Sequence, residues 1–461
     1  MKKLRIVAVG SLAALALAAC SSNGSTGTTA TGSAPASAAA TTAAAPAPAN
    51  IKLWLVGSDT PDNLRQYLKD QFAKENPGST LTIEEQGWGD LVTKLTTALP
   101  DAANTPDVTE LGNTQSSTFT NVGAFLDVTD LVPSLGGDKL LKGFVEAGVV
   151  DGKNYTLPYY FGSRYVFYRK DLWAAAGITS TPKTLAEFNT DVATIASKDP
   201  NGVKNLSGLW LGGQDWRNGI SWIFANGGEI AVKDGSSWKA TFEDPKTEEG
   251  LKQLQAIWTA ASKAPKDATD ANTYNHLNDA DSVKATDGTT TSYSLDAATI
   301  LAPGWAHWSI GDLTKKDGKD VRTWNDATFG VFVLPGVSGG AAPVFAGGSN
   351  IGISAKSTHP ELAKNLLKII FSPEYQQMLG KAGLGPANTD YVSSLGTDQF
   401  ANALSSSALN AKLTPAAPGW AALENSKKLE EFFQKIATGA DIDATAKAFD
   451  AEITPILNGQ G

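Results

Sequence analysis

Strands and helices alternate at the start of the folded chain, and this order constrains the fold more than any other feature. The apolar run Ile51–Leu55 predicts a buried strand, and Thr60-Pro61 predicts the start of a helix through a cap and a first-turn proline. Strands at residues 80–84 and 107–111 follow, separated by a helix from about Asp90 to Leu99. This order indicates a doubly wound α/β fold.

The middle and the end of the chain show the same helical texture. Thr184-Leu-Ala-Glu187 has the pattern of a capping box, Asp244-Pro245 caps a second helix, and Pro360 starts a third. No repeat of solenoid length is present. Residues 51–461 are too many for one hydrophobic core, so we expect two lobes.

The first residues have the pattern of an export signal. Lys2, Lys3 and Arg5 precede the apolar residues 6–19, which are too few to span a bilayer, since a spanning helix needs about 20. Leu17-Ala-Ala-Cys20 looks like a bacterial lipobox, in which the cysteine is acylated and becomes the new N-terminus. An ordinary cleaved signal with an incidental cysteine is the alternative, but no second cysteine exists to pair with Cys20. We expect residues 1–19 to be a signal peptide.

Residues 20–50 are expected to be a lipidated cysteine followed by a disordered tether. Residues 21–50 consist almost wholly of Ser, Thr, Gly, Ala and Pro, without a charged or aromatic residue. This composition cannot bury enough apolar surface to offset the entropy of ordering. Two or more acyl chains suffice for stable anchoring, so the chain is expected outside the cytoplasm on the bacterial cell membrane.

Composition and charge exclude several classes of partner. Without residues 1–19, 35 of the 38 basic residues remain against 47 acidic ones, a net charge of −12. A nucleic-acid partner would require a basic face, and anionic lipid head groups would require a polybasic patch. Apart from the signal, no apolar run approaches the length of a membrane span.

The motifs of common enzymes are missing. The three histidines, His276, His307 and His359, lack metal-ligand spacing, and no thiol remains after lipidation of Cys20. Residues 347–351 miss G-x-S-x-G at the last position. We therefore expect no metal, no cofactor and no catalytic residue. Paired carboxylates for glycoside cleavage stay open, because their separation is invisible in a sequence.

Tryptophan is abundant, with 12 residues, and several lie beside Gly, Asn or Asp in predicted loops. An indole in a loop folds back on the core or faces a cleft, and its flat face suits the apolar face of a pyranose. Trp305 and Trp420, each after Ala-Pro-Gly, are expected to face a cleft, and Trp88 could do either. Indoles inside regular elements are expected to fill the core: Trp54, Trp173 and Trp258.

Polar side chains that could bind hydroxyl groups lie in similar places. Leu111-Gly-Asn113-Thr114 ends a predicted strand, where open α/β sheets bind ligands. Gly347-Gly-Ser349-Asn350 precedes another strand, and its glycines allow close approach to a ligand. Asn and Ser beside Gly are also common turn formers, so neither motif decides alone.

The order and spacing of several motifs resemble the extracellular solute-binding proteins of ABC transporters, in the sugar-binding branch with the maltose-binding protein. The resemblance covers about residue 50 to the end. It rests on the following segments: 111–114, 158–160 with Arg164 and 167–172, 225–228, 329–335, 345–350 and 383–386. It implies a two-lobe periplasmic-binding-protein-like α/β fold (type II) that closes on a sugar.

The resemblance also implies where the lobes divide. Chain crossings are expected near Leu157–Phe161, near Asn350 and near Pro386–Asn388. Lobe one would comprise residues 51–158 with 350–388, and lobe two residues 159–349 with 389–461.

The residues implied to face the sugar are carried over by position. From lobe one and the crossing they are Ser58, Asp59, Asn113, Thr114, Ser349 and Asn350. From the hinge and lobe two they are Tyr160, Arg164, Trp216, Asn226, Trp305 and Trp420, and Trp88 is added for its loop position. Many relatives have an aromatic residue after the Asn-Thr pair, where this chain has Gln115.

The resulting hypothesis is a lipid-anchored, monomeric receptor that binds a mono- or oligosaccharide and delivers it to an ABC permease with its cytoplasmic ATPase. One alternative is a surface glycoside-processing enzyme. Another is the same receptor fold with a peptide, polyamine or osmolyte as cargo. A cationic cargo would require several carboxylates in the cleft, whereas the expected set contains Asp59 and also Arg164.

Overall fold

The described part of this computed structural model comprises residues 46–284 and 290–460. The expected signal peptide, Cys20 and the tether as far as residue 45 therefore lie outside the described residues. In the described ranges, no helix combines the length and the apolar character that crossing a bilayer would need.

One eight-stranded sheet runs through the molecule, in the order β11-β6-β15-β3-β1-β2, with β14 and β16 also paired to β6. β1 lies parallel to β2 and β3, as the alternation predicted, whereas β15 lies antiparallel to β3 and to β6. The strands are β1 (Asn50–Val56), β2 (Thr80–Gln86), β3 (Val108–Gly112), β6 (Thr156–Arg169), β11 (Thr299–Pro303), β14 (Phe329–Phe332), β15 (Ala346–Ile353) and β16 (Gly385–Pro386).

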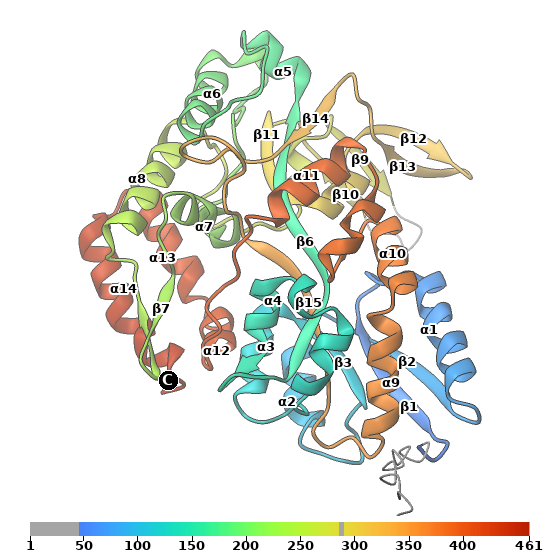
Figure 1. The fold of residues 1–461 in the computed structure, drawn as a ribbon. Helices are drawn as coiled ribbons and strands as arrows, with labels where there is room; N and C mark the ends of the chain where they lie inside the picture. Colours follow the sequence, from blue (N-terminus) through green and yellow to red (C-terminus); the bar gives the residue numbers. More distant parts are fainter. Residues whose placement is uncertain (1–45, 285–289, 461) are drawn as a thin grey trace, which may run out of the picture. The chain divides into compact units, whose positions relative to one another are not determined.

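The first core forms where helices cover β1, β2 and β3, and it joins side chains such as Leu53, Leu64 and Leu366. Figure 1 shows α1 and α9 beside these strands. The apolar spacing of α1 buries Leu64, Leu68 and Phe72 on one face. The helices of this part are α1 (Asp62–Glu75), α2 (Leu91–Ala98), α3 (Asn113–Thr120), α4 (Lys142–Ala147), α9 (Pro360–Ile370) and α10 (Pro373–Lys381).

The second core is built mainly from helices, and it joins side chains such as Phe188, Ile220 and Leu254. The predicted N-cap of α6 is confirmed, because Thr184 Oγ1 accepts from the backbone N–H of Glu187 at 3.2 Å, while the Glu187 side chain accepts from the backbone N–H of Lys183 rather than closing the box on Thr184. The helices are α5 (Lys170–Ala175), α6 (Leu185–Lys198), α7 (Trp216–Ala225), α8 (Pro245–Ala260), α11 (Gln399–Ala408), α12 (Trp420–Asn425), α13 (Lys428–Ala437) and α14 (Ile442–Leu457).

Short hairpins and 3-10 turns complete the chain. The hairpins are β4 (Val149–Val150) with β5 (Lys153–Asn154), β7 (Ala231–Asp234) with β8 (Ser237–Ala240), β9 (Asp281–Lys284) with β10 (Thr290–Tyr293), and β12 (Asp312–Lys316) with β13 (Lys319–Thr323). The 3-10 turns are η1 (Thr129–Leu135), η2 (Gly137–Lys139), η3 (Pro200–Gly202), η4 (Thr273–His276), η5 (Gly304–Ser309) and η6 (Thr389–Leu395).

Two strands run from one core into the other. β6 contributes Leu157 and Tyr159 to the first core and Val166 to the second. β15 begins directly after Phe345, which belongs to the second core, and ends with Ile351 and Ile353 in the first core. The two cores are therefore joined by continuous backbone at the crossing, and the functional cavity lies there.

Candidate functional site

A cavity of about 820 Å³ lies at this crossing, within the usual range of small-molecule sites. Ser58 and Asp59 reach it from the loop after β1, Trp88 from the loop after β2, and Asn113 from the start of α3 after β3. These loops follow the carboxyl ends of three parallel strands, where open α/β sheets bind ligands. The facing wall comes from β6, η5, Phe345 and α12.

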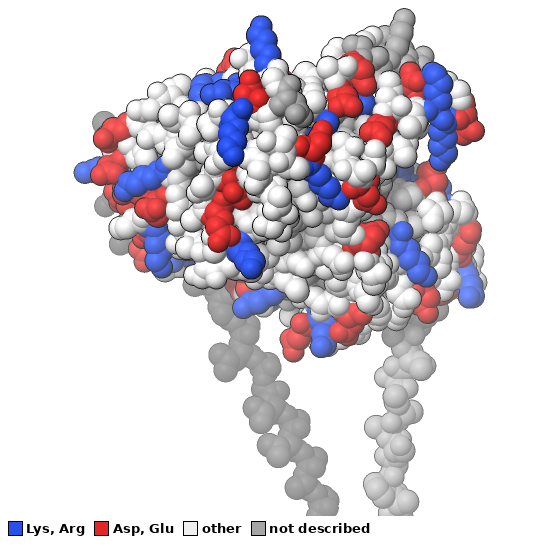
Figure 2. Space-filling model, turned by 90° about the horizontal axis from the view of Figure 1, so that it is seen from above, with Lys and Arg blue, Asp and Glu red and all other residues white. Residues whose placement is uncertain are grey.

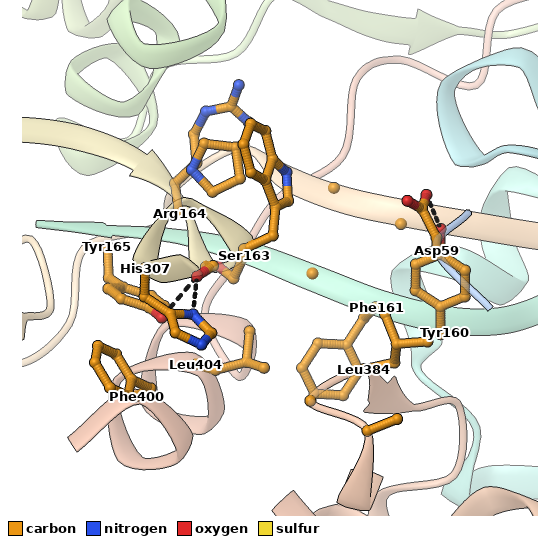
Figure 3. Close-up of a pocket in the computed structure, with 18 of the residues that line it drawn as sticks. Asp59, Tyr160, Phe161, Ser163, Arg164, Tyr165, His307, Leu384, Phe400 and Leu404 are labelled. Atoms are coloured by element: carbon orange, nitrogen blue, oxygen red, sulfur yellow. Dashed lines mark hydrogen bonds between the residues drawn. The ribbon is translucent and has the colours of Figure 1, made fainter. Parts of the chain in front are cut away.

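Eight of the thirteen predicted ligand-binding residues line the cavity, and the other five lie elsewhere. Those that line the cavity are Ser58, Asp59, Trp88, Asn113, Thr114, Tyr160, Arg164 and Trp305. Figure 3 shows Asp59 and Tyr160 at one end of the cavity, with Tyr165, His307, Phe400 and Leu404 at the other.

Asp59 orients the aromatic side chains beside it. Its Oδ2 accepts from Trp88 Nε1 at 3.1 Å and from the Tyr160 hydroxyl at 2.9 Å. The preceding Gly57 has φ +58°, and a Cβ there would lie 3.1 Å from Trp88 Nε1. Glycine at this position therefore permits both the left-handed turn and the close approach of the indole.

A buried carboxyl group, that of Glu110, connects the strands beside this end of the cavity. Glu110 on β3 accepts from the Val56 backbone N–H at 2.8 Å and from Ser349 Oγ at 2.5 Å. Burial raises the pKa of Glu110 to about 8, and it also raises the pKa of Tyr160. The Glu110 side chain is therefore largely protonated at neutral pH and joins β1, β3 and β15 without placing a full charge there.

Arg164 is held in a network of paired charges. Its Nε donates to Asn218 Oδ1 and its Nη2 donates to Asp270 Oδ2, both at 2.8 Å. Asp215, which is fully buried, accepts from the backbone and side chain of Asn218, and burial raises its pKa. Arg164 is therefore fixed in position at the cavity, and Asp270 balances the positive charge of its guanidinium group.

Glu424 of α12 takes part in an ion pair within the second core and also contacts α3 of the first core. Arg217 donates to Glu424 Oε1 at 2.7 Å, and the Thr114 hydroxyl donates to Glu424 Oε2 at 3.3 Å. Nearby, Ser117 Oγ donates to the Ala417 carbonyl at 3.1 Å. We call these contacts between α3 and the 417–424 segment the latch, because they hold the cores together on one side of the cavity.

Exposed indoles stand on opposite walls of the cavity. Trp88 is 40% exposed on one side, and Trp305 and Trp308 are 52% and 59% exposed on the other. Trp305 and Trp308 both belong to η5 and are three residues apart, and residues at this spacing eclipse in a 3-10 helix. Both indoles therefore point to the same side.

The prediction that Trp216 and Trp420 face the cleft is wrong. Both are fully buried in the second core and pack edge to face, with ring centroids 6.1 Å apart. The sequence pattern placed them in loops, but each is the first residue of a helix, α7 or α12. The packing of these helices buries the indoles.

Asn226, Ser349 and Asn350 also lie outside the cavity lining, contrary to the expectation. Asn226 caps the end of α7 and donates to the Trp222 carbonyl at 2.8 Å. Ser349 is fully buried on Glu110, and Asn350 Nδ2 donates to the Phe144 carbonyl at 2.8 Å. Ser349 and Asn350 thus hold the crossing together, while Gly347 and Gly348 of the same motif do line the cavity.

Sequence analysis missed several lining residues. Trp308 could have been found from its three-residue spacing to Trp305. The sequence carries no such signal for Arg217, Glu424, His307 or Phe345, which reach the cavity through long-range packing. Trp54, Trp173 and Trp258 are buried, so the prediction that they fill the core is confirmed.

A cavity between two α/β cores that share crossing strands defines the class of two-lobe ligand-binding proteins. The sequence matches the family of bacterial extracellular solute-binding proteins over residues 57–377. The chain belongs to this family, as the resemblance predicted. Members of the family are binding proteins rather than enzymes, and they act outside the cytoplasm with ABC permeases.

Individual relatives support this membership. The chain is 31% identical over 413 residues, 88% of its length and 89% of the relative's, to the diacetylchitobiose binding protein DasA of Streptomyces coelicolor. The structure resembles that of the sugar-binding protein MalE from Xanthomonas citri, with a TM-score of 0.73, 22% identity and coverage of 89% of this chain and 98% of the other. The cyclic alpha-maltosyl-1,6-maltose binding protein from Arthrobacter globiformis gives 0.68, with 16% identity and coverage of 90% and 100%. Both structures share the two-lobe fold.

Proposed function

We propose that this protein is the sugar receptor of an ABC importer and that it binds a mono- or oligosaccharide in the cavity at the crossing. The observation that carries the proposal is the set of exposed indoles, Trp88 facing Trp305 and Trp308, at a cavity that also contains polar groups. Indole faces stack on the apolar faces of pyranose rings, and the polar groups bind the hydroxyls at their edges.

The predicted residues that line the cavity take separate roles in this proposal. Trp88 and Trp305 stack on sugar rings, and Asp59 accepts hydrogen bonds from hydroxyl groups while it keeps the Trp88 indole in place. Ser58, Asn113, Thr114, Tyr160 and Arg164 provide further hydrogen bonds. A micromolar dissociation constant requires about 8 kcal/mol, which stacked rings and several buried hydrogen bonds supply together.

Binding is proposed to be coupled to closure of the lobes. Lobe one would be residues 51–158 with 350–388, and lobe two residues 159–349 with 389–461. The strands β6 and β15 pass between the cores and would absorb the rotation, as hinges do. A sugar that contacts both walls favours the closed state, which would then dock on the permease.

The proposed protein is a monomer held at the membrane by a lipid on Cys20, after removal of residues 1–19. The spacing of the lipobox and the composition of residues 21–50 support this anchor. Figure 2 shows basic and acidic side chains interspersed over one face of the described part, without a large patch of one sign. Anchoring is thus assigned to the lipid rather than to charge.

Titration of the protein with a panel of neutral sugars, followed by tryptophan fluorescence and calorimetry, tests the proposal. We expect saturable binding of at least one sugar and its recovery unchanged after long incubation. Cleaved sugar would support the glycoside-processing alternative instead. Binding of polyamines, peptides or osmolytes with no response to any sugar would overturn the assignment of the cargo.

A further inference from the structure

The cavity continues along β6 past a gap in its strand pairing. β16 pairs with β6 at Tyr160 and Phe161, and β11 pairs with β6 from Arg164 onward. Gly162 and Ser163 lie between these two pairings on one edge of β6, whereas β15 pairs with both on the other edge, and both line the cavity. A ligand can therefore reach this part of β6 between the two neighbouring strands.

Ser163 is a polar side chain without a partner at this gap. The residue is 2% exposed, and its hydroxyl has no hydrogen-bond partner among the described residues. Buried hydroxyl groups in native proteins are nearly always hydrogen-bonded, so an unpaired one that lines a cavity points to a bound group. The Ser163 hydroxyl would donate to a ligand oxygen.

His307 offers the complementary atom at the same end of the cavity. Its Nδ1 donates to the Gly304 carbonyl at 2.7 Å, and its ring stacks on Phe400 with centroids 4.5 Å apart. A carbonyl can only accept, so Nδ1 carries the proton and Nε2 of the neutral ring is left as an acceptor. Burial lowers the pKa of His307, which keeps the ring neutral at pH 7.

Most of the remaining wall near His307 is apolar, and the charged residue Asp398, which acts electrostatically on His307 and Tyr165, also lines the cavity. Phe161 and Tyr165 come from β6, and Phe400 and Leu404 come from α11 (Figure 3). The Tyr165 hydroxyl donates to the Gly304 carbonyl at 3.3 Å, so Tyr165 contributes an aromatic ring to this wall and no unpaired polar group. We call Ser163, His307, Phe161, Phe400 and Leu404 the side pocket.

We propose that the side pocket binds the acetamido group of an N-acetylated sugar. This inference rests on the proposed function and narrows it. An acetamido group carries a carbonyl oxygen, an N–H and a methyl group. The Ser163 hydroxyl donates to the carbonyl, His307 Nε2 accepts from the N–H, and Phe161, Phe400 and Leu404 surround the methyl. A plain hydroxyl has no methyl group, so it would leave the apolar walls uncovered.

A matched set of disaccharides tests the side pocket by calorimetry at pH 7. N,N′-diacetylchitobiose, cellobiose and chitobiose share the β-1,4 backbone and carry an acetamido, a hydroxyl or an amino group at the same position. We expect the acetylated sugar to bind at least about tenfold more tightly than cellobiose, because its methyl group buries apolar surface and its carbonyl and N–H pair separately with Ser163 and His307.

Two variants then test whether the side pocket causes the preference for the acetylated sugar. Ser163→Ala and His307→Phe should each weaken binding of diacetylchitobiose about three- to tenfold and leave binding of cellobiose nearly unchanged. Ser134→Ala is the control, since Ser134 is exposed in η1 and donates only to the Leu131 carbonyl. Thermal melts of each variant show that it is folded.

The outcomes separate the inference from the proposed function. Equal binding of cellobiose and diacetylchitobiose, or a preference that survives both substitutions, would overturn the side pocket while the sugar receptor stands. A folded protein that binds none of the sugars in the wider panel would overturn the receptor itself.

Discussion

Substitution of Trp305 by alanine gives the sharpest test of the stacking wall. A tryptophan side chain has up to about 250 Å² of surface, and Trp305 is 52% exposed, which leaves about 130 Å² accessible. A sugar ring that covers half of this area at about 25 cal/mol per Å² gains about 1.6 kcal/mol. We therefore expect Trp305→Ala to raise the dissociation constant about 15-fold.

The assay compares sugar binding and stability in Trp305→Ala and Trp420→Ala, because both tryptophans follow the same residues, Ala-Pro-Gly. Calorimetry with the tightest sugar of the panel should show the weaker binding of Trp305→Ala, while its urea unfolding stays close to wild type. Trp420→Ala should instead lower the free energy of unfolding by about 3–5 kcal/mol, because it removes a fully buried indole. Unchanged sugar affinity in Trp305→Ala, measured on folded protein, would refute the stacking argument.

Two further predictions concern the carboxyl groups around the cavity. The folded pKa of Glu110, about 8, lies above its ordinary value of 4.5, so its proton stabilises the fold fully at low pH, and this contribution is lost as pH rises from about 4.5 to 8. The free energy of unfolding of Glu110→Gln should therefore rise relative to that of wild type over this pH range, by several kcal/mol at pH 8, and urea titrations measure it. A difference between the two proteins that does not change with pH would contradict the neutral, buried carboxyl group. Glu424→Gln should remove the charge that pairs with Arg217 and weaken the Thr114 contact of the latch, together by about 1–3 kcal/mol, increase the radius of gyration of the unliganded protein in X-ray scattering and weaken sugar binding several-fold. An unchanged radius and affinity would show that the latch does not hold the lobes.

Local pattern indicated only part of one wall of the cavity: Asn113 was expected at the end of a strand, whereas Ser58 and Asp59 came from the family resemblance and the position of Trp88 was left open. In the structure all four residues follow parallel strands and line the cavity. The carboxyl ends of neighbouring parallel strands meet at one edge of a sheet, so the meeting of these loops follows from the order of the elements. The same reasoning could not find the partners of this wall on the other core.

Long-range pairs account for what was missed. Arg217 and Glu424 are far apart in the sequence, and each lies near a tryptophan that the pattern placed in the cleft. In the structure the tryptophans, Trp216 and Trp420, turn inward, and the neighbouring charged side chains reach the cavity rim. Which residue of a helix start faces the core depends on the helices that pack against it, and local spacing does not contain this information.

The repeated Ala-Pro-Gly-Trp sequence separates the two kinds of information most clearly. From the sequence alone come the α/β order of the elements, the polar loops at the strand ends and the family, because these depend on periodicity and on motifs that are local in the chain. Only the tertiary structure decided that Trp305 lies open on a 3-10 turn after β11 while Trp420 is enclosed as α12 begins. The two indoles have identical preceding residues, so their different exposure is set by the elements that surround them.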